Sequence, residues 1–278
     1  MSLRRERTGH PRSREGTALV QIMQAKGSTP RDTGTCMLVT ATSTKGTIGG
    51  GEAERLAVEA ARNMLAQGSD KAVLNLPLGP EIGQCCGGHL ALEIFRTTSA
   101  MLDDLAKREA ASAAQAPLVM IYGAGHVGRA LAQALAPLPF RVRLVDSREA
   151  EFAGLIAPGV EQVCTQTVVA QAEAAPPGAA HVILTHSHAL DSLIAATLLE
   201  RGDFAYLGII GSKTKRAVFE RAFAEMGIAP KQIARITCPI GGTNVRDKRP
   251  AVIAALVAAE LLGGSVRSVH FDPVANSC

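Results

Sequence analysis

Aromatic residues are scarce in this sequence. Phe, Tyr and Trp make up 3% of its 278 residues, and Trp is absent. Single-stranded nucleic acids are bound by stacking bases on aromatic side chains, so we expect no nucleic-acid partner. The sequence also lacks an apolar run of roughly 20 residues, the length that a membrane span needs. The pair Arg4-Arg5 could suggest twin-arginine export, but the apolar stretch that follows it is short and lacks the small-residue cleavage pattern that a signal peptide has. We therefore expect a cytoplasmic protein with no membrane partner.

Cysteine pairs with metal-site or redox spacing are also missing. The six cysteines include no C-x-x-C pair and are scattered along the chain, so reduced thiols are expected rather than a disulfide framework. The net charge of +4 is modest, and five arginines fall within the first fourteen residues. We expect residues 1–16 to be a disordered, solvated basic tail.

The six cysteines named above are Cys36, Cys85, Cys86, Cys164, Cys238 and Cys278.

The remaining composition is that of a globular protein with two domains. Hydrophobic residues make up 47% and charged residues 19%, which is enough apolar material for a full core. Residues 17–98 predict a small N-terminal α/β domain, with a helix from the glycine run at 49–51 to about residue 67. Its predicted strands are 17–24, 36–40, 46–48, 72–76 and 90–95.

Residues 99–116 are rich in Ala, Ser and Gln and predict a helical or loose linker. Strand and helix patterns alternate over residues 117–270, which is typical of a Rossmann-like, doubly wound parallel sheet covered on both faces. Helices are expected after Gly125, Ala189, Lys213 and Pro250. The predicted strands are 118–122, 141–146, 160–164, 181–185, 205–210 and 234–238.

A glycine fingerprint opens this second domain. The apolar run 118–122 leads into Gly123, Gly125 and Gly128 in the pattern G-x-G-x-x-G. In such βα turns the first glycine permits the tight turn, the second lets the backbone approach a pyrophosphate, and the third lets the helix pack on the strand. Asp146 follows Gly123 by 146 − 123 = 23 positions, near the roughly 20 expected of an acid that binds ribose. The pattern is more specific for the fold than for one ligand.

Two stretches of the first domain are unusual. Cys85 and Cys86 stand side by side between glycines, and thiolates are soft ligands and nucleophiles. They could hold a soft metal, receive a sulfur atom or hold the sulfur-rich end of a cofactor; alternatively, one of them simply packs inward. The run Gly49-Gly50-Gly51 precedes Glu52 and Glu54 at a helix start. Its backbone N–H groups could bind phosphate, or the acids could only complement the helix dipole.

A polar stretch follows the predicted strand 181–185. His186, His188 and Asp191 lie where doubly wound folds bind ligands, and His126 would face the same crevice. These side chains could bind a metal, or the stretch could be a polar loop with capping hydrogen bonds. The basic stretch 208–216 could meet phosphate or be solvated.

Together these motifs resemble the XdhC/CoxI family, the accessory proteins of molybdenum hydroxylases such as xanthine dehydrogenase. The resemblance covers nearly the whole chain after about residue 17, in the order of the family. The Cys-Cys-Gly-Gly and Thr-His-x-His elements are more particular than the glycine fingerprint. The matching stretches are 46–51 with Glu54, 84–88, 123–128, 146–148, 185–191, 208–215 and 238–241.

The resemblance implies a cofactor-binding chaperone without turnover of its own. It would bind molybdenum cofactor, keep it competent during sulfuration and deliver it to the molybdenum-binding subunit of xanthine dehydrogenase. A cysteine desulfurase is the second implied partner, and the family tendency implies a homodimer. Which glycine turn would hold which end of the cofactor stays open. The implied cofactor-binding residues are Cys85, Cys86, Gly49, Gly50, Gly51, Glu54, Gly123, Gly125, His126, Gly128, Asp146, His186 and His188.

Two other functions fit parts of the pattern. The glycine fingerprint with Asp146 also fits a nucleotide in the Rossmann-like domain and an NAD(P)-dependent oxidoreductase, and Arg148 leaves NAD and NADP both open. A metal-dependent enzyme would instead use His186, His188 and Asp191.

Overall fold

The computed structural model describes residues 16–79, 87–154, 157–242, 245 and 247–265. The described chain forms two compact units, which divide between Ser112 and Ala113. We call them the N-terminal unit and the C-terminal unit. The expected basic tail, apart from Gly16, and the pair Cys85-Cys86 lie outside the described residues.

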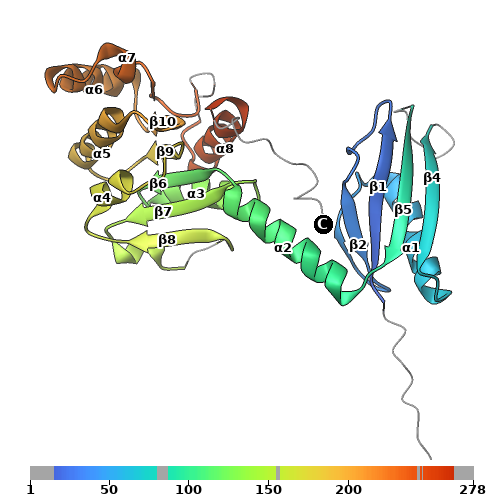
Figure 1. Ribbon diagram of the computed structural model, residues 1–278. Coiled ribbons are helices and arrows are strands. Elements are labelled where there is room, and N and C mark those ends of the chain that lie inside the picture. Colours follow the sequence, from blue (N-terminus) through green and yellow to red (C-terminus); the bar gives the residue numbers. More distant parts are fainter. Residues whose placement is uncertain (1–15, 80–86, 155–156, 243–244, 246, 266–278) are drawn as a thin grey trace, which may run out of the picture. The chain divides into compact units, whose positions relative to one another are not determined.

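The N-terminal unit is an antiparallel sheet with one helix packed on it. Its strands lie in the order β3-β2-β1-β5-β4, and every neighbouring pair is antiparallel. Helix α1 covers one face of the sheet (Figure 1). The elements are β1 (Ala18–Lys26), β2 (Cys36–Val39), β3 (Thr44–Gly46), α1 (Gly51–Ala66), β4 (Lys71–Leu78) and β5 (Gly88–Arg96).

Alternation along the strands decides which face α1 covers. In β5, Leu90, Leu92 and Ile94 are fully buried, whereas the residues between them are half-buried. Because successive side chains of a strand point to opposite faces, one face of the sheet is apolar and receives the helix. The helix meets it mainly through alanines at helical spacing, which allow a close approach. The buried residues of α1 are Ala53, Ala57, Ala61, Met64 and Leu65.

A single helix, α2 (Ser99–Gln115), carries the chain from one unit to the other. None of its 17 residues is buried. Alanine, lysine and glutamate are good helix formers, so the helix owes its formation to local propensity rather than to a core. Of the two forms expected for the linker, the helical one is observed.

The C-terminal unit is a six-stranded parallel sheet in the order β11-β10-β9-β6-β7-β8. Numbered within the unit, this is the Rossmann order 6-5-4-1-2-3. The predicted doubly wound domain is confirmed. The strands are β6 (Leu118–Tyr122), β7 (Arg141–Asp146), β8 (Val160–Cys164), β9 (Ala180–Ile183), β10 (Tyr206–Ile209) and β11 (Ile236–Thr237).

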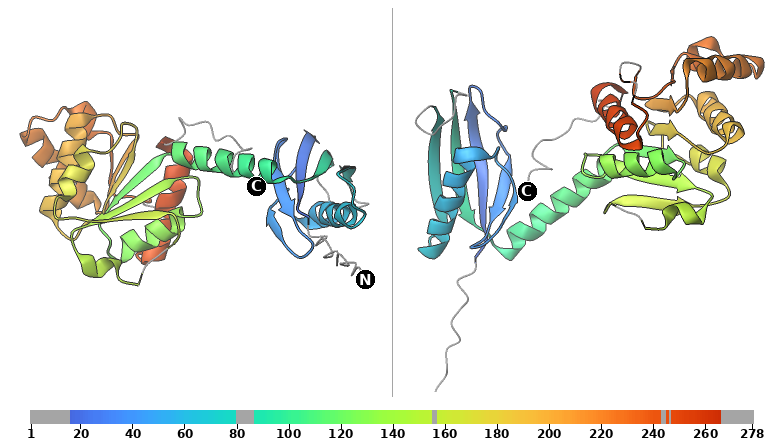
Figure 2. Two further views of the ribbon diagram at one scale, coloured as in Figure 1. Left: turned by 60° about the horizontal axis from the view of Figure 1, so that its bottom comes forward. Right: turned by 180° about the vertical axis from the view of Figure 1, so that it is seen from behind.

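Helices cover both faces of this sheet, as Figures 1 and 2 show. All five residues of β6 are buried, as expected for a strand between two helical layers. Val119 and Ile121 pack with α3 and α8, whereas Met120 and Tyr122 pack with α4, α5 and α6. The helices are α3 (His126–Leu135), α4 (Val168–Glu173), α5 (His188–Arg201), α6 (Lys213–Glu225), α7 (Pro230–Ile233) and α8 (Pro250–Glu260).

The boundaries differ from those expected in a few places. The third strand of the first unit is Thr44–Gly46 rather than 46–48, because Gly46 already has φ +84° and ends the extended run. The last strand is only Ile236–Thr237, since it pairs with β10 alone. The short helices α4 and α7 were not expected from the sequence. Within the described residues, none of the helices combines the length and apolarity that a bilayer crossing requires.

Candidate functional site

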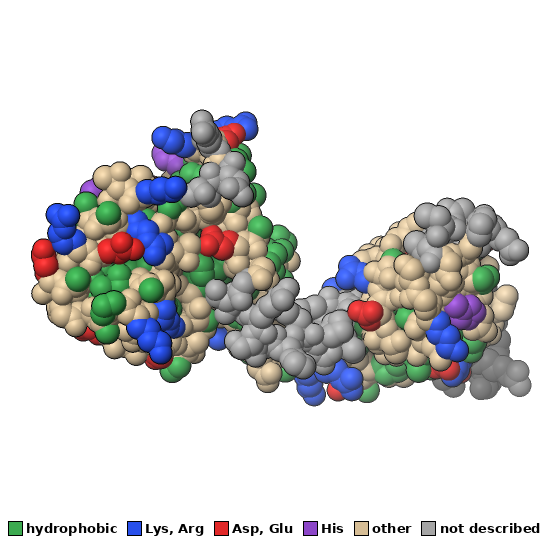
Figure 3. Space-filling view, turned by 90° about the horizontal axis from the view of Figure 1, so that it is seen from above, with side chains coloured by type: hydrophobic (Ala, Val, Ile, Leu, Met, Phe, Trp, Pro, Cys, Tyr) green, Lys and Arg blue, Asp and Glu red, His purple; other side chains and the backbone are tan. Residues whose placement is uncertain are grey.

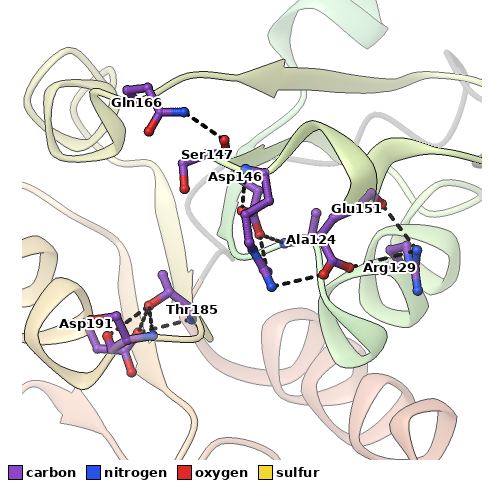
Figure 4. Close-up of polar contacts among 10 residues, drawn as sticks. Ala124, Arg129, Asp146, Ser147, Glu151, Gln166, Thr185 and Asp191 are labelled. Carbon is purple, nitrogen blue, oxygen red and sulfur yellow. Dashed lines mark hydrogen bonds and ion pairs between the residues drawn. The ribbon is translucent and has the colours of Figure 1, made fainter.

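The candidate site lies at the carboxyl ends of β6 and β9, where the strand order reverses. The chain leaves β6 toward β7 on one side, and β9 continues the sheet on the other side. Doubly wound folds bind ligands in the crevice at this position. The glycine turn follows β6 and the Thr185 loop follows β9, so the structure brings the two predicted motifs to the same edge (Figure 4).

The three glycines of the turn meet different demands. Gly123 has φ +117°, and a side chain there would press on the carbonyl of Leu184. A Cβ at Gly128 would collide with the carbonyl oxygen of Gly123, so helix α3 can pack on the turn only with glycine. Gly125 differs, because its φ is −65° and a Cβ there would meet no described atom within 4 Å. The fold itself does not require glycine at Gly125, and the space beside this residue is open.

Helix α3 begins at this turn without a side-chain cap. Among the described residues, no side chain accepts a hydrogen bond from its first turn, whereas Ser187 caps α5 and Ser212 caps α6. His126 is its first residue and is exposed. The unpaired N–H groups and the partial positive charge of a helix start attract an anion. This turn is therefore suited to the phosphate of a ligand.

Asp146, predicted as a ribose-binding acid, holds the turn in place. It ends β7 and is 4% exposed. Its Oδ2 accepts a hydrogen bond of 2.7 Å from the backbone N–H of Ala124 (Figure 4). The carboxylate thus fixes the backbone between Gly123 and Gly125 from the neighbouring strand.

Arg148 clamps the same carboxylate. Its Nη2 donates to Oδ2 at 2.7 Å, and its Nε and backbone N–H each donate to Oδ1 at 3.0 Å. Burial by itself raises the pKa of Asp146, but these hydrogen bonds outweigh it and hold the pKa below its usual value. Arg148 also pairs with Glu151 at 2.9 Å, and Arg129 donates to the carbonyl of Glu151. This edge of the sheet therefore carries a network of balanced charges.

The Thr185 loop has its own buried carboxylate. Asp191 is fully buried, and its Oδ1 accepts hydrogen bonds from Thr185 Oγ1 at 2.7 Å and from Thr185 N at 3.0 Å. Its Oδ2 pairs with Lys215 Nζ at 3.0 Å. His186 and His188 are exposed on the outside of the loop. The aspartate therefore shapes the loop, while both histidines remain available to a ligand or partner.

A metal centre is not supported at this loop. Within the part of the chain that the structure describes, no group of three or more His, Cys, Asp or Glu side chains could hold a metal ion. His188 Nδ1 lies 3.9 Å from Asp191 Oδ2, but that oxygen is already occupied by Lys215. His186, His188 and Asp191 therefore do not form a three-ligand metal site among the described residues.

The triple-glycine turn of the N-terminal unit is closed by its own glutamate. Glu54 Oε2 accepts hydrogen bonds from the backbone N–H groups of Ile48 and Gly50, both at 3.0 Å, and from the Thr47 hydroxyl. The N–H groups of Ile48 and Gly50 are thus used within the chain, and Glu52 and Glu54 place negative charge at the start of α1, which disfavours an anion there. Of the two glycine turns, the one at α3 is the better anion site.

An open groove of about 570 Å³ runs along α1, but its lining carries both signs of charge. Arg55 and Arg62 face it together with Glu54 and Glu59, so the lining has no net preference for an anion. The other lining residues are Thr44, Gly51, Val58 and Asn63.

The cysteines are more varied than the sequence predicts. Cys85 and Cys86, the predicted soft ligands, lie outside the described residues. Cys36 is buried and disulfide-bonded, so the expectation of reduced thiols is wrong for this residue. Cys164 and Cys238 are free. Burial raises the pKa of the Cys238 thiol in spite of the nearby Lys215.

The glycines after the cysteine pair have local reasons of their own. Gly87 has φ +64° and donates a hydrogen bond to the carbonyl of Leu78. A Cβ at Gly88 would press on the carbonyl oxygen of Ser28. These glycines are therefore not evidence that Cys85-Cys86 forms a binding loop.

The surface of the C-terminal unit shows mixed charge. On the face in Figure 3, the basic and acidic side chains of this unit are interspersed. The described residues on that face form no patch of one sign.

Sequence reasoning missed the partners of the two buried carboxylates. Lys215 lies 24 residues from Asp191, and no local pattern connects them. The sequence suggests Arg148 only as a group that distinguishes NAD from NADP, and not as the hydrogen-bond partner of Asp146. The one sequence feature that could have predicted this pair is the spacing of two residues between them.

Comparisons with known proteins agree with this architecture. The chain is 30% identical over 249 residues to a protein of Escherichia coli K12 described as uncharacterized protein YqeB, with 88% of this chain covered. It spans only 43% of the length of that relative. A Bacillus halodurans protein described as a xanthine dehydrogenase has the same fold, with a TM-score of 0.73 and 16% identity. The match covers 90% of this chain and 92% of that one.

Family profiles match both units. The profile of the XdhC and CoxI family matches residues 11–75. The profile of the XdhC Rossmann domain matches residues 119–261, which is more than half of the chain and includes the whole crevice described above. The chain therefore belongs to the XdhC and CoxI family.

Proposed function

We propose that this chain is an accessory protein of a xanthine dehydrogenase system that binds molybdenum cofactor and delivers it to the molybdenum-binding subunit. The observation that carries the proposal is the open glycine turn at Gly125, at the reversal of strand order in a family member. The cofactor would be cargo, kept competent during sulfuration and then released. No turnover by the chain itself is part of the proposal.

The crevice suits the phosphate end of that cargo. Molybdenum cofactor is an anionic pterin with a phosphate at one end and a dithiolene-bound metal at the other. The uncapped start of α3 offers N–H donors to the phosphate, and Gly125 leaves room for it. His126, His186 and His188 would bind at the same edge as further polar contacts. The turn at Gly49–Gly51, where Glu54 already occupies the N–H groups of Ile48 and Gly50, is assigned a structural role.

The sulfur-rich end remains assigned to Cys85 and Cys86 on chemical grounds alone. Thiolates are soft ligands that suit a dithiolene-bound metal or a sulfur donor. A cysteine desulfurase is accordingly proposed as the second partner and a homodimer as the assembly. Both come from the family resemblance.

Purification of the full chain from cells supplied with molybdate tests the binding step. Mass spectrometry and elemental analysis should find molybdenum and the pterin in equal amounts on the protein. The loaded protein should restore xanthine hydroxylation to a molybdenum-binding subunit that lacks its cofactor. If neither pterin nor molybdenum co-purifies and no activity is restored, the proposal is wrong.

Substitution of the cysteines tests the thiol part separately. Cys85→Ala and Cys86→Ala should each weaken cofactor retention or transfer, whereas Cys164→Ala, which removes an exposed free thiol, should not. Unchanged loading with both of the first two variants would remove the thiols from the proposal and leave the phosphate site in place.

A further inference from the structure

All acceptor positions of Asp146 are occupied within the protein. A carboxylate has about four lone-pair directions. At Asp146 they receive four donors: the backbone N–H of Ala124, and the backbone N–H, Nε and Nη2 of Arg148, at 2.7–3.0 Å. Its side chain is 3% exposed. The carboxylate has no free oxygen lone pair to offer to a ligand.

Ribose recognition by this acid would require the opposite arrangement. In Rossmann domains that bind NAD, the acid at this position accepts a hydrogen bond from a ribose hydroxyl. Such a hydroxyl would have to displace Arg148 from the carboxylate here. That would break a two-pronged, charge-assisted pair, which is among the stronger interactions available to side chains.

Arg148 replaces those acceptors with donors. A guanidinium has five N–H groups, and Arg148 uses its Nε and Nη2 on Asp146 and its Nη1 on Glu151. Its side chain is 36% exposed, so its unused N–H groups can reach a ligand, unlike the buried carboxylate. This side of the site therefore offers N–H donors at the position where a ribose diol would need a carboxylate acceptor.

We propose that Arg148 sets the ligand specificity of the crevice, because it closes the ribose-diol position at Asp146 and presents donors to an anionic group instead. This role of Arg148 deepens the proposed function, and it depends on that function only for the statement that a ligand binds at this edge of the sheet. The ligand class is one that places phosphate at the α3 turn without a ribose diol at Asp146. A pterin phosphate belongs to that class, and NAD does not.

Calorimetry with NAD⁺ on the full-length protein tests this assignment. Arg148→Ser frees two acceptor positions on Asp146, and we expect it to bind NAD⁺ about tenfold more tightly than the wild type, or better, since a hydrogen bond to a charged group is involved. Arg148→Lys retains the charge but reaches one oxygen only, so it should fold as the wild type does and gain part of that affinity. Arg108→Ala, which removes an exposed arginine of α2, should leave NAD⁺ binding unchanged.

Equal NAD⁺ affinity in the wild type and in folded Arg148 variants would overturn the assignment, whether that affinity is high or immeasurably weak. Circular dichroism establishes that each variant is folded. The result is independent of the cargo experiment. A gain of NAD⁺ binding without any co-purified pterin would count against the proposed function alone, and retained pterin without the gain would count against the role of Arg148 alone.

Discussion

At the scale of single residues, the glycine turn separates requirements of the fold from requirements of a ligand. Gly128 is required because a Cβ there would collide with the carbonyl oxygen of Gly123. Gly125 has an ordinary φ and open space beside it. Substitution of each by alanine therefore has a different expected consequence.

Gly128→Ala should destabilise the C-terminal unit by about 1–3 kcal/mol, because the turn or the helix must shift to admit the methyl group. Gly125→Ala should change stability by less than about 0.5 kcal/mol but should lower cofactor retention, since the methyl group would stand where the phosphate approaches. Thermal unfolding and the pterin content of the purified protein measure the two effects.

Gly263→Ala is the matched control, because a Cβ there also meets nothing within 4 Å. This glycine lies in a helical turn, so the substitution should not lower stability, and it should leave retention unchanged. Loss of stability in Gly125→Ala, or full cofactor retention by it, would contradict the ligand role of Gly125.

His181 gives the stability of the C-terminal unit a dependence on pH. It is 1% exposed, bonds to the Tyr122 hydroxyl at 3.0 Å, and burial lowers its pKa to about 4, with Arg201 adding to the shift. Since the folded pKa lies below the unfolded value of about 6.5, the folded state favours the neutral ring. The free energy of unfolding that the neutral ring contributes is fully present above about pH 6.5 and is lost as the pH falls toward 4.

The free energy of unfolding should therefore fall between pH 7 and pH 5 by about 2 kcal/mol on account of His181. Urea titrations of the wild type and of His181→Gln at both pH values measure it. Other groups titrate in both proteins, so the difference between the two pH dependences isolates His181. Identical pH dependences would show that His181 is not held neutral.

At the scale of elements, the turn that precedes helix α1 is held by Glu54, the fourth residue of that helix. Glu54 accepts three hydrogen bonds from the turn before the helix, two of them from backbone N–H groups. Capping interactions at helix starts are worth about 0.5–2 kcal/mol. The turn has three consecutive glycines with positive φ, so it depends on these bonds to stay ordered.

Glu54→Ala should accordingly lower the stability of the N-terminal unit by about 1–2 kcal/mol. Glu54→Gln retains a carbonyl oxygen and should lose less. Glu59→Ala is the control on the same helix, because its pair with Arg55 is exposed and should contribute little. Denaturant unfolding of the full chain ranks the three, and equal stability of Glu54→Ala and Glu59→Ala would contradict the capping role.

At the scale of the whole molecule, two cores are joined by a helix that belongs to neither. The buried residues form one cluster in the N-terminal unit and two in the C-terminal unit, whereas α2 contributes none. A helix of this length with no buried residue is marginally stable in water. Local opening of α2 should therefore precede unfolding of either unit.

In a Lys248→Arg background, which removes the exposed lysine of the irregular segment before α8, endoproteinase Lys-C should cut first at Lys107 of α2 and should leave two fragments that remain folded. Lys107→Arg removes the cleavage site with little change of charge or helix propensity, and should slow the first cut. Mass spectrometry of the early fragments identifies it. A first cut within a strand of either unit, at a rate unaffected by Lys107→Arg, would contradict the independence of the two cores.

Much of the fold follows from local patterns. Residues 118–122, 141–146 and 160–164 are the strands β6, β7 and β8 with the bounds that hydrophobicity predicts. The strand order also follows, because an alternating β–α pattern with a glycine fingerprint permits few arrangements. Short elements such as α4 and β11 were missed or mis-sized, since they carry too few residues for a periodic signal.

The sequence by itself determined the two-part α/β architecture, the family, and the residues that reach the carboxyl edge of the parallel sheet. Only the tertiary structure decided what those residues are free to do. The carboxylate of Asp146 accepts hydrogen bonds from Arg148 and Ala124. The carboxylate of Glu54 accepts one from Gly50 in the glycine turn, and that of Asp191 accepts one from Lys215. The physical reason is that spacing predicts which side chains share an edge, whereas hydrogen-bonding capacity depends on where each donor points. Gly125 alone among the three turn glycines has open space beside it, as the fingerprint predicts for its second glycine, whereas Gly128 is confined by the packing that the fingerprint predicts for its third.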